Sequence, residues 1–336
     1  MQMEQALPLG QILSLSLALT GLLFTLPLAL VKPLEPPQEA PPPVVQSGPV
    51  VEAVPVSVPP VETASLPAVT LQVLHRGKVV PMDLEDYLVG VVRAEMPASF
   101  HPEALKAQAV AARTYTLYQV AGGGRHGDAH ICTDPGCCQA YLTQEEAVAR
   151  WGDRADELCR KTEQAVRDTA GEILLYGGEP ILAAFHAASP ARTRAAGEVW
   201  SRDLPYLQSV SSPETAEAVP GWRETVVFSG QDFRDRTGAK GWPSDPVTDE
   251  AGIVRSLTLD GETRSGTWVR DRLALRSACF TWSVEGDEIA FTTTGYGHGV
   301  GMSQYGADVM AAQGSGYRDI LTHYYPGAVF GLTGEQ

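Results

Sequence analysis

The sequence predicts an α+β fold, a single domain with a mixed core of helices and strands that follows two unusual N-terminal segments. Two observations predict this class. Helical patterns concentrate before residue 170 and strand-like, turn-rich segments follow, so helices and strands do not alternate as they do in a βαβ series. The folded part, residues 68–336, is long enough to bury a core without disulfide staples and contains no internal repeat.

The elements of this domain follow from local signals. Asp83 is placed to cap a helix over residues 84–95, which must end before Met96-Pro97 because the residue before a proline disfavours helical backbone. Pro102 suits the first turn of a second helix over 102–120, which glycines end. We also expect two strands over 69–82 around an Arg-Gly turn, a helix over 145–169, strands over 171–176 and 180–188, and a helix near 306–313.

The first N-terminal segment, residues 6–31, is mostly apolar and carries no charged side chain. Its 26 residues exceed the roughly 20 that a helix needs to cross the hydrocarbon core of a bilayer. A signal peptide would have a basic start, whereas Glu4 is the only charged side chain before this run. We therefore expect a single-pass transmembrane signal anchor in the cell membrane, with residues 1–5 in the cytoplasm and the domain outside. A cleaved export signal is the competing interpretation.

The second segment, residues 32–67, contains eleven of the 25 prolines and is poor in aromatic residues. Such a composition cannot bury enough apolar surface to fold, and its prolines favour extended polyproline II. We interpret the segment as a disordered linker rather than as a ligand for a proline-binding domain.

Charge excludes one class of partner. Forty acidic residues against 25 basic ones give the chain a net charge of −15. Five of the acidic residues and one basic residue precede Ala68, so the domain alone carries −11. No basic surplus is available to neutralise a phosphate backbone, which argues against nucleic-acid binding.

Glu95 occupies the last turn of the helix predicted over 84–95. Backbone carbonyl dipoles point toward a carboxylate there, which raises its pKa, as a general acid working near neutral pH requires. An exposed glutamate, or one paired with Arg93, is the alternative. On the next helix Lys106 and Arg113, seven residues apart, share one face, where they either bind a substrate or form structural ion pairs.

Two long stretches resemble one known family. YLVGVVRAEMPASFHPEALKAQAVAARTYTL and GYGHGVGMSQYGA are similar to the sporulation stage II protein D family, also called the SpoIID/LytB domain. The resemblance extends from about Leu71 to Phe330. It implies a SpoIID-like domain with a substrate groove. For members that are enzymes, it implies a lytic transglycosylase that cuts peptidoglycan glycan strands during sporulation and engulfment and leaves an anhydro-muramoyl end.

Matched residue by residue, the family's catalytic glutamate corresponds to Glu95, and its binding residues correspond to Lys106, Gln108 and Arg113. One carboxylate suffices for this chemistry, whereas ordinary glycosidases need two. A hydroxyl of the substrate's own muramic acid attacks the anomeric carbon, so one glutamate protonates the leaving oxygen and then accepts the proton of that hydroxyl. Holding the hydroxyl in line is an orientation effect that a groove rich in hydrogen-bonding groups supplies.

Three of the five cysteines lie within seven residues and point to a metal site. His126, Cys132, Cys137 and Cys138 form an H-x5-C-x4-C-C pattern, and imidazole with thiolates suits a closed, structural tetrahedral zinc site. Some relatives carry zinc in this loop; His126, Cys132 and Cys138 match their pattern, and Cys137 replaces a commoner histidine. We predict structural Zn2+, with His130 as an alternative fourth ligand. Free thiols or a redox-labile pair are the alternative to a metal.

The stretch GYGHGVGMSQYGA lacks the Lys-Ser/Thr pair of a phosphate-binding loop. Its glycines allow the backbone to approach a neighbour or a ligand closely. We expect its side chains to line the glycan groove, with the tyrosines stacking on sugars; the residues are Tyr296, His298, Ser303, Gln304 and Tyr305. A glycine-dense turn around a structural histidine is the alternative.

A second family stretch, F-H-S-x-S-G-G-x-T, is altered in this chain, which reads FHAASPART. Ser189 matches a serine of the family stretch and is predicted to contact the substrate. Ala187, Pro190 and Ala191 replace the other serine and both glycines, and Pro190 fixes a backbone angle that glycine leaves free.

The resemblance also implies partners: glycan strands stripped of stem peptides, a cell-wall N-acetylmuramoyl-L-alanine amidase and other engulfment proteins. The altered FHAASPART loop favours a second hypothesis, a non-catalytic wall-binding modifier or activator of such an amidase. Glu95 and the two cations that follow it favour the enzyme. A zinc hydrolase is disfavoured because four protein ligands leave no open position for water.

Overall fold

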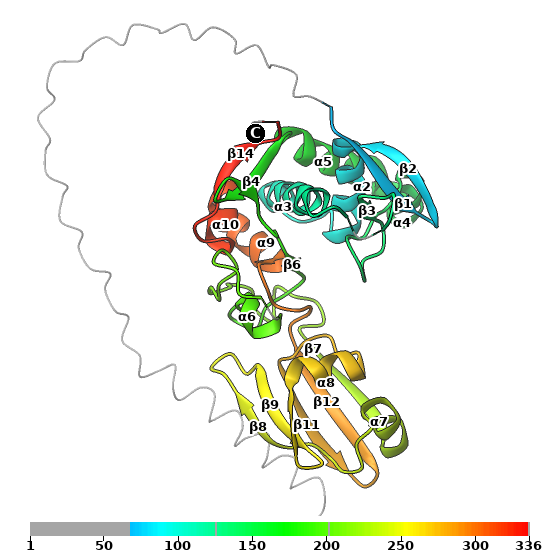
Figure 1. Cartoon of the computed structure of the whole chain (residues 1–336), viewed down its shortest axis with the longest axis vertical. Helices are drawn as coiled ribbons and strands as arrows, with labels where there is room; N and C mark the ends of the chain where they lie inside the picture. The colour runs from blue at the N-terminus through cyan, green and yellow to red at the C-terminus, as the bar shows by residue number, and fades with distance from the viewer. Residues whose placement is uncertain (1–67, 125, 201, 335–336) are drawn as a thin grey trace, which may run out of the picture. The chain divides into compact units, whose positions relative to one another are not determined.

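A computed structural model describes residues 68–124, 126–200 and 202–334, which belong to one compact unit of the chain. Within this range helices and strands are mixed, as the sequence predicts for an α+β fold (Figure 1). The predicted anchor over 6–31 and linker over 32–67 lie outside the described residues. In the part that is described, no helix is both long and apolar enough to span a bilayer.

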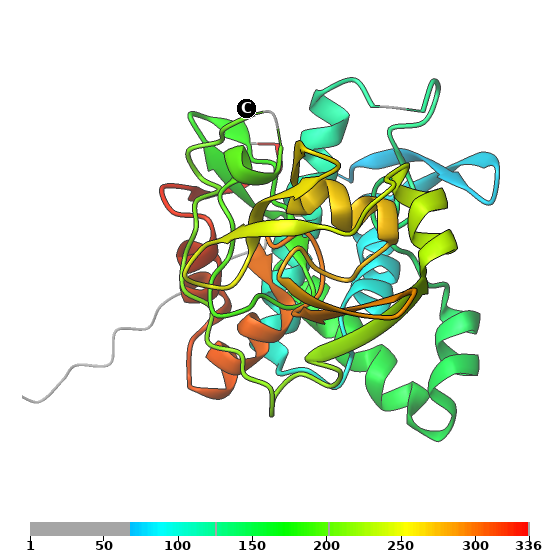
Figure 2. The ribbon, with the colours of Figure 1, turned by 90° about the horizontal axis from the view of Figure 1, so that it is seen from below.

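Two layers with separate hydrophobic cores make up this part of the chain. We call residues 69–210 and 300–332 the helical layer, and residues 223–294 the sheet layer. None of the described residues 223–294 enters the core of the helical layer. Figure 2 looks from the side of the sheet layer, with helices of the helical layer behind it.

The helical layer contains most of the helices and three small sheets. Its helices are α2 (Leu84–Glu95), α3 (Pro102–Ala121), α4 (Gln144–Trp151), the 3-10 turn η1 (Gly152–Arg154), α5 (Ala155–Asp168), α6 (Ala196–Val199), α9 (Gln304–Ala312) and α10 (Tyr317–Tyr324). Its strands are β1 (Thr70–His75), β2 (Lys78–Asp83), β3 (Ile131–Cys132), β4 (Glu172–Tyr176), β5 (Glu179–Pro180), β6 (Phe185–His186), β13 (Met302–Ser303) and β14 (Val329–Leu332). The sheets have the orders β2-β1-β3, β14-β4-β5 and β13-β6.

The sheet layer consists of two antiparallel sheets and two short helices. Its elements are β7 (Arg223–Ser229), α7 (Gly230–Thr237), β8 (Ser244–Thr248), β9 (Val254–Leu259), β10 (Glu262–Ser265), α8 (Gly266–Leu273), β11 (Phe280–Glu285) and β12 (Glu288–Thr294). The sheets have the orders β11-β12-β7 and β10-β9-β8. Phe228, Phe233, Phe280 and Phe291 meet in the core of this layer.

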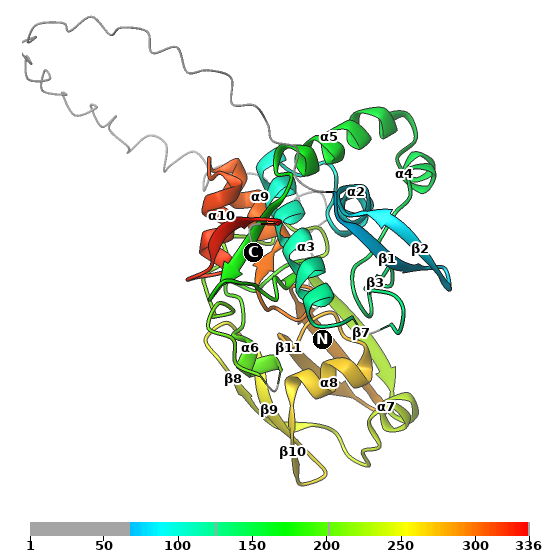
Figure 3. The same cartoon turned by 45° about the horizontal axis from the view of Figure 1, so that its top comes forward.

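Helix α3 is the centre of the helical layer. It packs against α2, α5, α9, α10 and β4 (Figure 3). Its small side chains make this close packing feasible, because buried alanines allow neighbouring elements to approach. The fully buried alanines are Ala104, Ala107, Ala109, Ala111 and Ala112.

The predicted starts of α2 and α3 are confirmed. The side chain of Asp83 accepts a hydrogen bond from the backbone N–H of Glu85 at 2.9 Å and caps α2. Pro102 begins α3, where a missing N–H costs nothing. Both helices therefore have the bounds that capping residues and proline predict.

Two predicted elements differ from the structure. The helix expected over 145–169 is divided into α4 and α5 by Gly152, whose φ of 54° ends α4. The strand expected over 180–188 is reduced to β5 and β6, because the N–H groups of Ala183 and Ala184 donate to Ile181 and Leu182 rather than to a neighbouring strand. Local hydrogen bonds thus replace strand pairing in the segment between β5 and β6.

A short parallel pairing lies where the chain passes between the layers. In it Phe185 is opposite Met302, and two isolated bridges join the same stretches elsewhere: an antiparallel one between Ala188 and Tyr296, and a parallel one between Arg194 and Val300. Glycine is required here: a Cβ on Gly301, at φ 72°, would lie 2.0 Å from the carbonyl oxygen of Ala184. The stretches GYGHGVGMSQYGA and FHAASPART therefore run side by side.

Ala191 has a φ of 64°, in the left-handed region that favours glycine. We expect Ala191→Gly to raise the free energy of unfolding by up to about 1 kcal/mol, because relief of this strain outweighs the added freedom of the unfolded chain. Urea denaturation measures the change. The matched control is Ala149→Gly, at an exposed position within α4, which should lower the free energy of unfolding by about 1 kcal/mol. Loss of stability in both variants would contradict the assignment of strain to Ala191.

Candidate active site

Glu95 ends α2 with its side chain half-buried. Its Oε1 accepts a hydrogen bond from the backbone N–H of Ala140 at 2.5 Å. Burial raises the pKa of Glu95 to about 7, and the hydrogen bond from Ala140 opposes this rise. The alternative pairing with Arg93 is wrong, since Nη2 of Arg93 lies 2.6 Å from Oε1 of Glu163. A raised pKa was expected from the helix dipole, whereas burial is its main cause in the structure.

Glu95 lies on the walls of two cavities, of about 550 and 990 Å³, on the surface of the protein. Within the described chain, Glu95 is the only acidic residue in either wall. The residues shared by both cavities are Ala94, Glu95, Arg150, Ala187, Tyr296 and Gln304. Among the described residues, Glu95 is therefore the one acidic group that the two cavities have in common.

Four of the predicted groove residues lie on these walls. Tyr296 and Gln304 line both cavities, His298 lines the larger one and Tyr305 the smaller one. Tyr296 is 53% exposed, and the guanidinium of Arg276 lies 5.2 Å from its ring centre. An exposed tyrosine ring beside a carboxyl group is suited to stacking on a sugar.

His298 is a neutral hydrogen-bonding group rather than a charged one. The backbone N–H of Val300 donates to its Nδ1 at 3.0 Å, so Nε2 carries the ring proton. Burial lowers the pKa of His298 to about 4, with a smaller contribution from the nearby charge of Arg270. His298 therefore fits both interpretations of this stretch: it lines the larger cavity, and it is also a structural histidine whose ring accepts a backbone hydrogen bond.

Ser189 and Ser303 are fully buried behind the cavity walls. The Oγ of Ser189 lies 2.6 Å from Nε2 of His186, and its backbone N–H donates to Oε1 of Glu214 at 2.6 Å. The Oγ of Ser303 donates to the same carboxylate oxygen at 2.5 Å. The structure thus places both serines in a network that joins the two motif stretches, and it does not bring either to a cavity.

The three polar residues predicted on α3 are also placed away from the cavities. Lys106 forms ion pairs with Glu103 at 3.0 Å and Asp168 at 3.2 Å. Arg113 is fully buried and binds both carboxylate oxygens of Glu85, at 2.8 and 2.6 Å. Gln108 is buried as well, and its Oε1 accepts a hydrogen bond from Gln304 at 3.2 Å.

Neighbouring acidic and amide side chains explain why Lys106, Arg113 and Gln108 lie away from the cavities. Lys106 and Arg113 do share a face of α3, as their spacing predicts, but acidic residues of α2, α3 and α5 surround that face. Structural ion pairs, the alternative stated for these cations, are what the structure contains. Gln108 reaches the site only indirectly, since it holds the lining residue Gln304.

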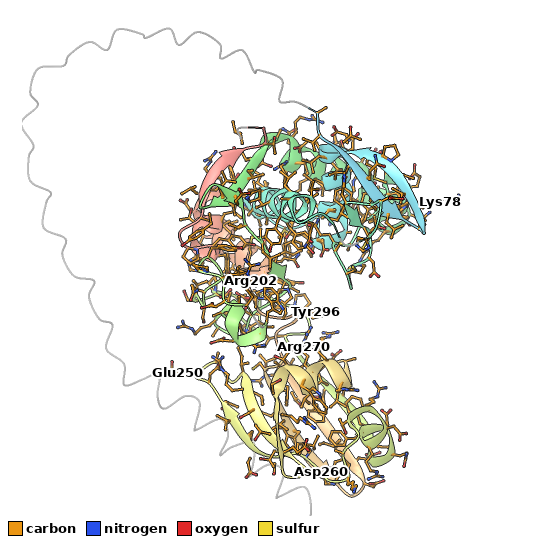
Figure 4. The ribbon with its side chains drawn as sticks, in the orientation of Figure 1. Lys78, Arg202, Glu250, Asp260, Arg270 and Tyr296 are labelled. Carbon is orange, nitrogen blue, oxygen red and sulfur yellow. The ribbon has the colours of Figure 1, made fainter. Side chains whose placement is uncertain are left out.

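Several residues that line the cavities were not predicted from the sequence, because no motif marks them. Arg150 lines both cavities, and Tyr115, Tyr118, Trp200 and Arg202 line the larger one. Figure 4 shows Arg202, Tyr296 and Arg270 gathered where the helical layer faces the sheet layer. These residues come from separate elements, so no spacing in the sequence links them to Glu95.

The predicted metal ligands are brought together in space. One ligand atom from each of His126, Cys132, Cys137 and Cys138 lies within 4.8 Å of all the others. Nε2 of His126 is 3.2 Å from Sγ of Cys138 and 3.6 Å from Sγ of Cys137. Such separations suit four ligands around a tetrahedral zinc ion with bonds of about 2.0–2.3 Å. His130 is engaged elsewhere, since its Nδ1 accepts a hydrogen bond from the backbone of Gln72.

This cysteine cluster is connected to Glu95 through a short stretch of backbone. Cys138 is followed by Gln139, whose buried side chain donates to Oγ1 of Thr116 on α3 at 3.0 Å. The next residue, Ala140, donates its N–H to Glu95. The cluster and α3 therefore fix the segment that holds the carboxyl group.

Comparison with known proteins gives matches over most of the chain. The family model described as SpoIID, Stage II sporulation protein, matches residues 75–176. Stage II sporulation protein D of Bacillus subtilis (strain 168) is 37% identical over 282 residues, covering 82% of this chain and 79% of that protein. The protein of the same name from Bacillus amyloliquefaciens is 38% identical over 280 residues, covering 81% and 78%. An amidase enhancer of Bacillus subtilis (strain 168) is 28% identical over 302 residues, covering 71% of this chain and 39% of that protein.

The raised pKa of Glu95 predicts a pH-dependent stability. The folded state binds the proton more tightly than the unfolded state, so this contribution is complete below pH 4.5 and is lost as pH rises through about 7. Between these values the wild type should lose about 2–3 kcal/mol relative to Glu95→Gln, which cannot ionise. Denaturation of both proteins across this pH range measures the difference. A constant difference would contradict the raised pKa.

Proposed function

Because the chain belongs to the stage II sporulation protein D family, we propose that it is a lytic transglycosylase that cleaves peptidoglycan glycan strands with Glu95 as general acid and base. The observation that carries the proposal is the isolation of this carboxyl group. Glu95 is shared by two cavities, and their described walls contain no second carboxylate. Ordinary glycoside hydrolases need two carboxylates flanking the glycosidic bond. A mechanism in which the substrate supplies its own nucleophile needs one.

Each step follows from the state of Glu95. With a pKa of about 7, a substantial fraction of the carboxyl groups is protonated at neutral pH. The acid gives its proton to the glycosidic oxygen, and the bond from this oxygen to the anomeric carbon of muramic acid breaks. The carboxylate then accepts the proton of the C6 hydroxyl of the same sugar, whose oxygen bonds to the anomeric carbon. The products are a strand with a free hydroxyl and a strand with a 1,6-anhydro end, and Glu95 is protonated again.

The walls supply orientation for these steps. Tyr296 offers a ring to sugars in either cavity, and Gln304, which also lines both, has an amide for their hydroxyl groups. Neutral His298 lines the larger cavity, where its ring is held by hydrogen bonds to the backbone of Val300 and Phe185. By holding the C6 hydroxyl in line with the anomeric carbon, these wall residues would lower the entropic part of the activation barrier.

One observation favours a second candidate function. The chain is 28% identical to a protein named amidase enhancer, and its FHAASPART loop departs from the family stretch at three positions. A protein that binds wall glycan and modifies an N-acetylmuramoyl-L-alanine amidase without cutting would use the same cavities. Cleavage that depends on Glu95 separates the two candidates.

We also propose that His126, Cys132, Cys137 and Cys138 hold a zinc ion. Four protein ligands would close the coordination shell, so the ion would contribute structure and not a reactive water. It would tie together the loop that ends at Ala140, the residue that donates to Glu95. Removal of the ion is therefore expected to loosen the hydrogen bond at the acid.

Residues 6–31 are proposed to anchor the chain in the cell membrane, with residues 32–67 as a tether to a domain on the wall side. This arrangement fits a substrate located outside the membrane. A cell-wall amidase is the proposed partner, because it would strip stem peptides from the glycan before cleavage, with other engulfment proteins acting in the same process.

Substitution of the acid tests the proposed reaction. Glu95→Gln keeps an acceptor for the N–H of Ala140 but cannot transfer a proton, so cleavage should fall by at least about 100-fold. Purified glycan strands, with and without stem peptides, are digested by residues 68–336, and the products are analysed by mass spectrometry for anhydro ends. The matched control is Glu145→Gln, which removes an exposed carboxylate from the first turn of α4.

Two outcomes would contradict the enzyme. One is reducing ends in place of anhydro ends, which would indicate hydrolysis by water. The other is strand binding without cleavage by the unsubstituted protein on every substrate, which would favour the amidase modifier. Full activity in Glu95→Gln would remove Glu95 from the mechanism.

The metal prediction has its own test. The double variant Cys132→Ser, Cys138→Ser should lose bound zinc, measured as metal content per chain after purification. Amide hydrogen exchange at Ala140 should become faster in the same protein, because the loop is no longer tied. Cys279→Ser, which removes a thiol outside the cluster, is the matched control. Unchanged zinc content in the double variant would refute this ligand set.

A further inference from the structure

The walls of the two cavities have the opposite charge to the protein as a whole. The chain contains 40 acidic and 25 basic residues, yet Glu95 is the only acidic residue among the described residues that line either cavity. Guanidinium groups line both of them: Arg93, Arg150, Arg154 and Arg276 in the smaller cavity, and Arg150, Arg202 and Arg270 in the larger one. A basic groove on an acidic protein indicates a ligand with negative charges.

Most of these arginines already have acidic partners outside the walls. Arg93 pairs with Glu163 and Arg276 with Glu224, at 2.6 and 2.8 Å. Arg154 pairs with Glu157 at 3.3 Å, and Arg270 with Asp271 at 3.0 Å. Such pairs hold the side chains in place and reduce the net charge that each offers to a ligand.

Arg150 and Arg202 differ from the others. Neither forms an ion pair or a side-chain hydrogen bond with any residue that the structure describes. Both are exposed, so the five N–H donors of each guanidinium are accessible to a ligand. Arg150 is carried by the last turn of α4 and Arg202 by the segment after α6, so they reach the larger cavity from different elements.

These two cations do not act on Glu95 itself. Burial and the hydrogen bond from Ala140 are the causes that set the pKa of Glu95. A guanidinium next to the acid would lower the pKa and favour the charged form, which is the wrong form for a proton donor. Arg150 and Arg202 are therefore available to a ligand that occupies the cavities.

We propose that Arg150 and Arg202 bind the free lactyl carboxylates of muramic acid residues in the glycan strand. The inference rests on the proposed function, because it concerns the substrate that Glu95 would cleave. In a strand with stem peptides each lactyl group is an amide and carries no charge. Once the peptide is removed, the group is a carboxylate, which a guanidinium binds with two parallel hydrogen bonds. The two arginines thus give the site its selectivity for strands without peptides.

Binding to a protein that cannot cleave tests the inference. Arg150→Gln and Arg202→Gln are each made in the Glu95→Gln background of residues 68–336, and dissociation constants are measured by calorimetry. The ligands are soluble glycan strands without peptides and the same strands with their carboxyl groups converted to methyl amides. Each substitution should weaken binding to the carboxylate strands by about three- to tenfold. The Glu95→Gln protein with both arginines intact should bind the amide strands more weakly than the carboxylate strands. Neither arginine substitution should change its affinity for the amide strands.

Two controls separate the role of these arginines from a general effect of charge. Arg160→Gln removes an exposed arginine of α5 that lines neither cavity, and it should leave binding unchanged. Arg150→Lys keeps the charge without the planar pair of donors, so its affinity should lie between those of the arginine and glutamine forms. Raised salt should weaken binding to the carboxylate strands more than binding to the amide strands.

The inference is overturned if the substitutions weaken binding to both kinds of strand equally, if Arg160→Gln has the same effect, or if neither substitution changes affinity. Failure of the proposed function gives a different result. If the protein with intact Glu95 cleaves nothing but still prefers carboxylate strands through Arg150 and Arg202, the site binds such strands without cutting them. The lytic reaction is then excluded, and the role of the two arginines remains.

Discussion

The parallel pairing of β6 with β13 is the constraint on which the candidate site depends. It is two residues long on each side, with Phe185 opposite Met302 and His186 opposite Ser303. Because a Cβ on Gly301 or Gly297 would lie 2.0 or 2.7 Å from atoms of the opposite stretch, the pairing is possible only with glycine there. Glu214 reinforces the pairing, because its Oε1 accepts hydrogen bonds from the N–H of Ser189 and the Oγ of Ser303. Tyr296, His298 and Gln304 belong to the stretch that this pairing holds, and they line the larger cavity together with Glu95 of α2.

The electrostatic character of the site follows from separation of the charged groups. Glu95 is held by one backbone N–H and is surrounded mostly by uncharged atoms, so burial dominates its pKa. The cations nearest to it in the chain, Arg93 and Lys106, are neutralised by Glu163, Glu103 and Asp168. A carboxyl group with a raised pKa and walls that bear positive charge can coexist only if their charged atoms are kept apart.

Local signals predicted most of the fold and part of the site. The bounds of α2 and α3 followed from Asp83, Pro102 and the glycines after α3, because capping and proline act within one turn. The cysteine cluster could be predicted for the same reason, as its ligands are close in sequence. Arg113 shows the limit: its spacing of seven residues from Lys106 gave no sign that it donates to both carboxylate oxygens of Glu85, 28 residues earlier. Arg150, Trp200 and Arg202 were missed because only tertiary structure brings them to Glu95.

The register of β7 with β12 has a consequence for how such proteins can diverge. Arg223 lies opposite Thr294, so the sheet layer begins and ends at neighbouring points, and its core shares no residue with that of the helical layer. An insertion with adjacent ends can be lengthened, shortened or exchanged while its host keeps its own packing. Glu95 and its hydrogen-bond donor belong to the host, whereas Arg270 and Arg276 belong to the insertion. Evolution can therefore alter the arginine-bearing wall of the cavities independently of the part of the fold that holds the carboxyl group.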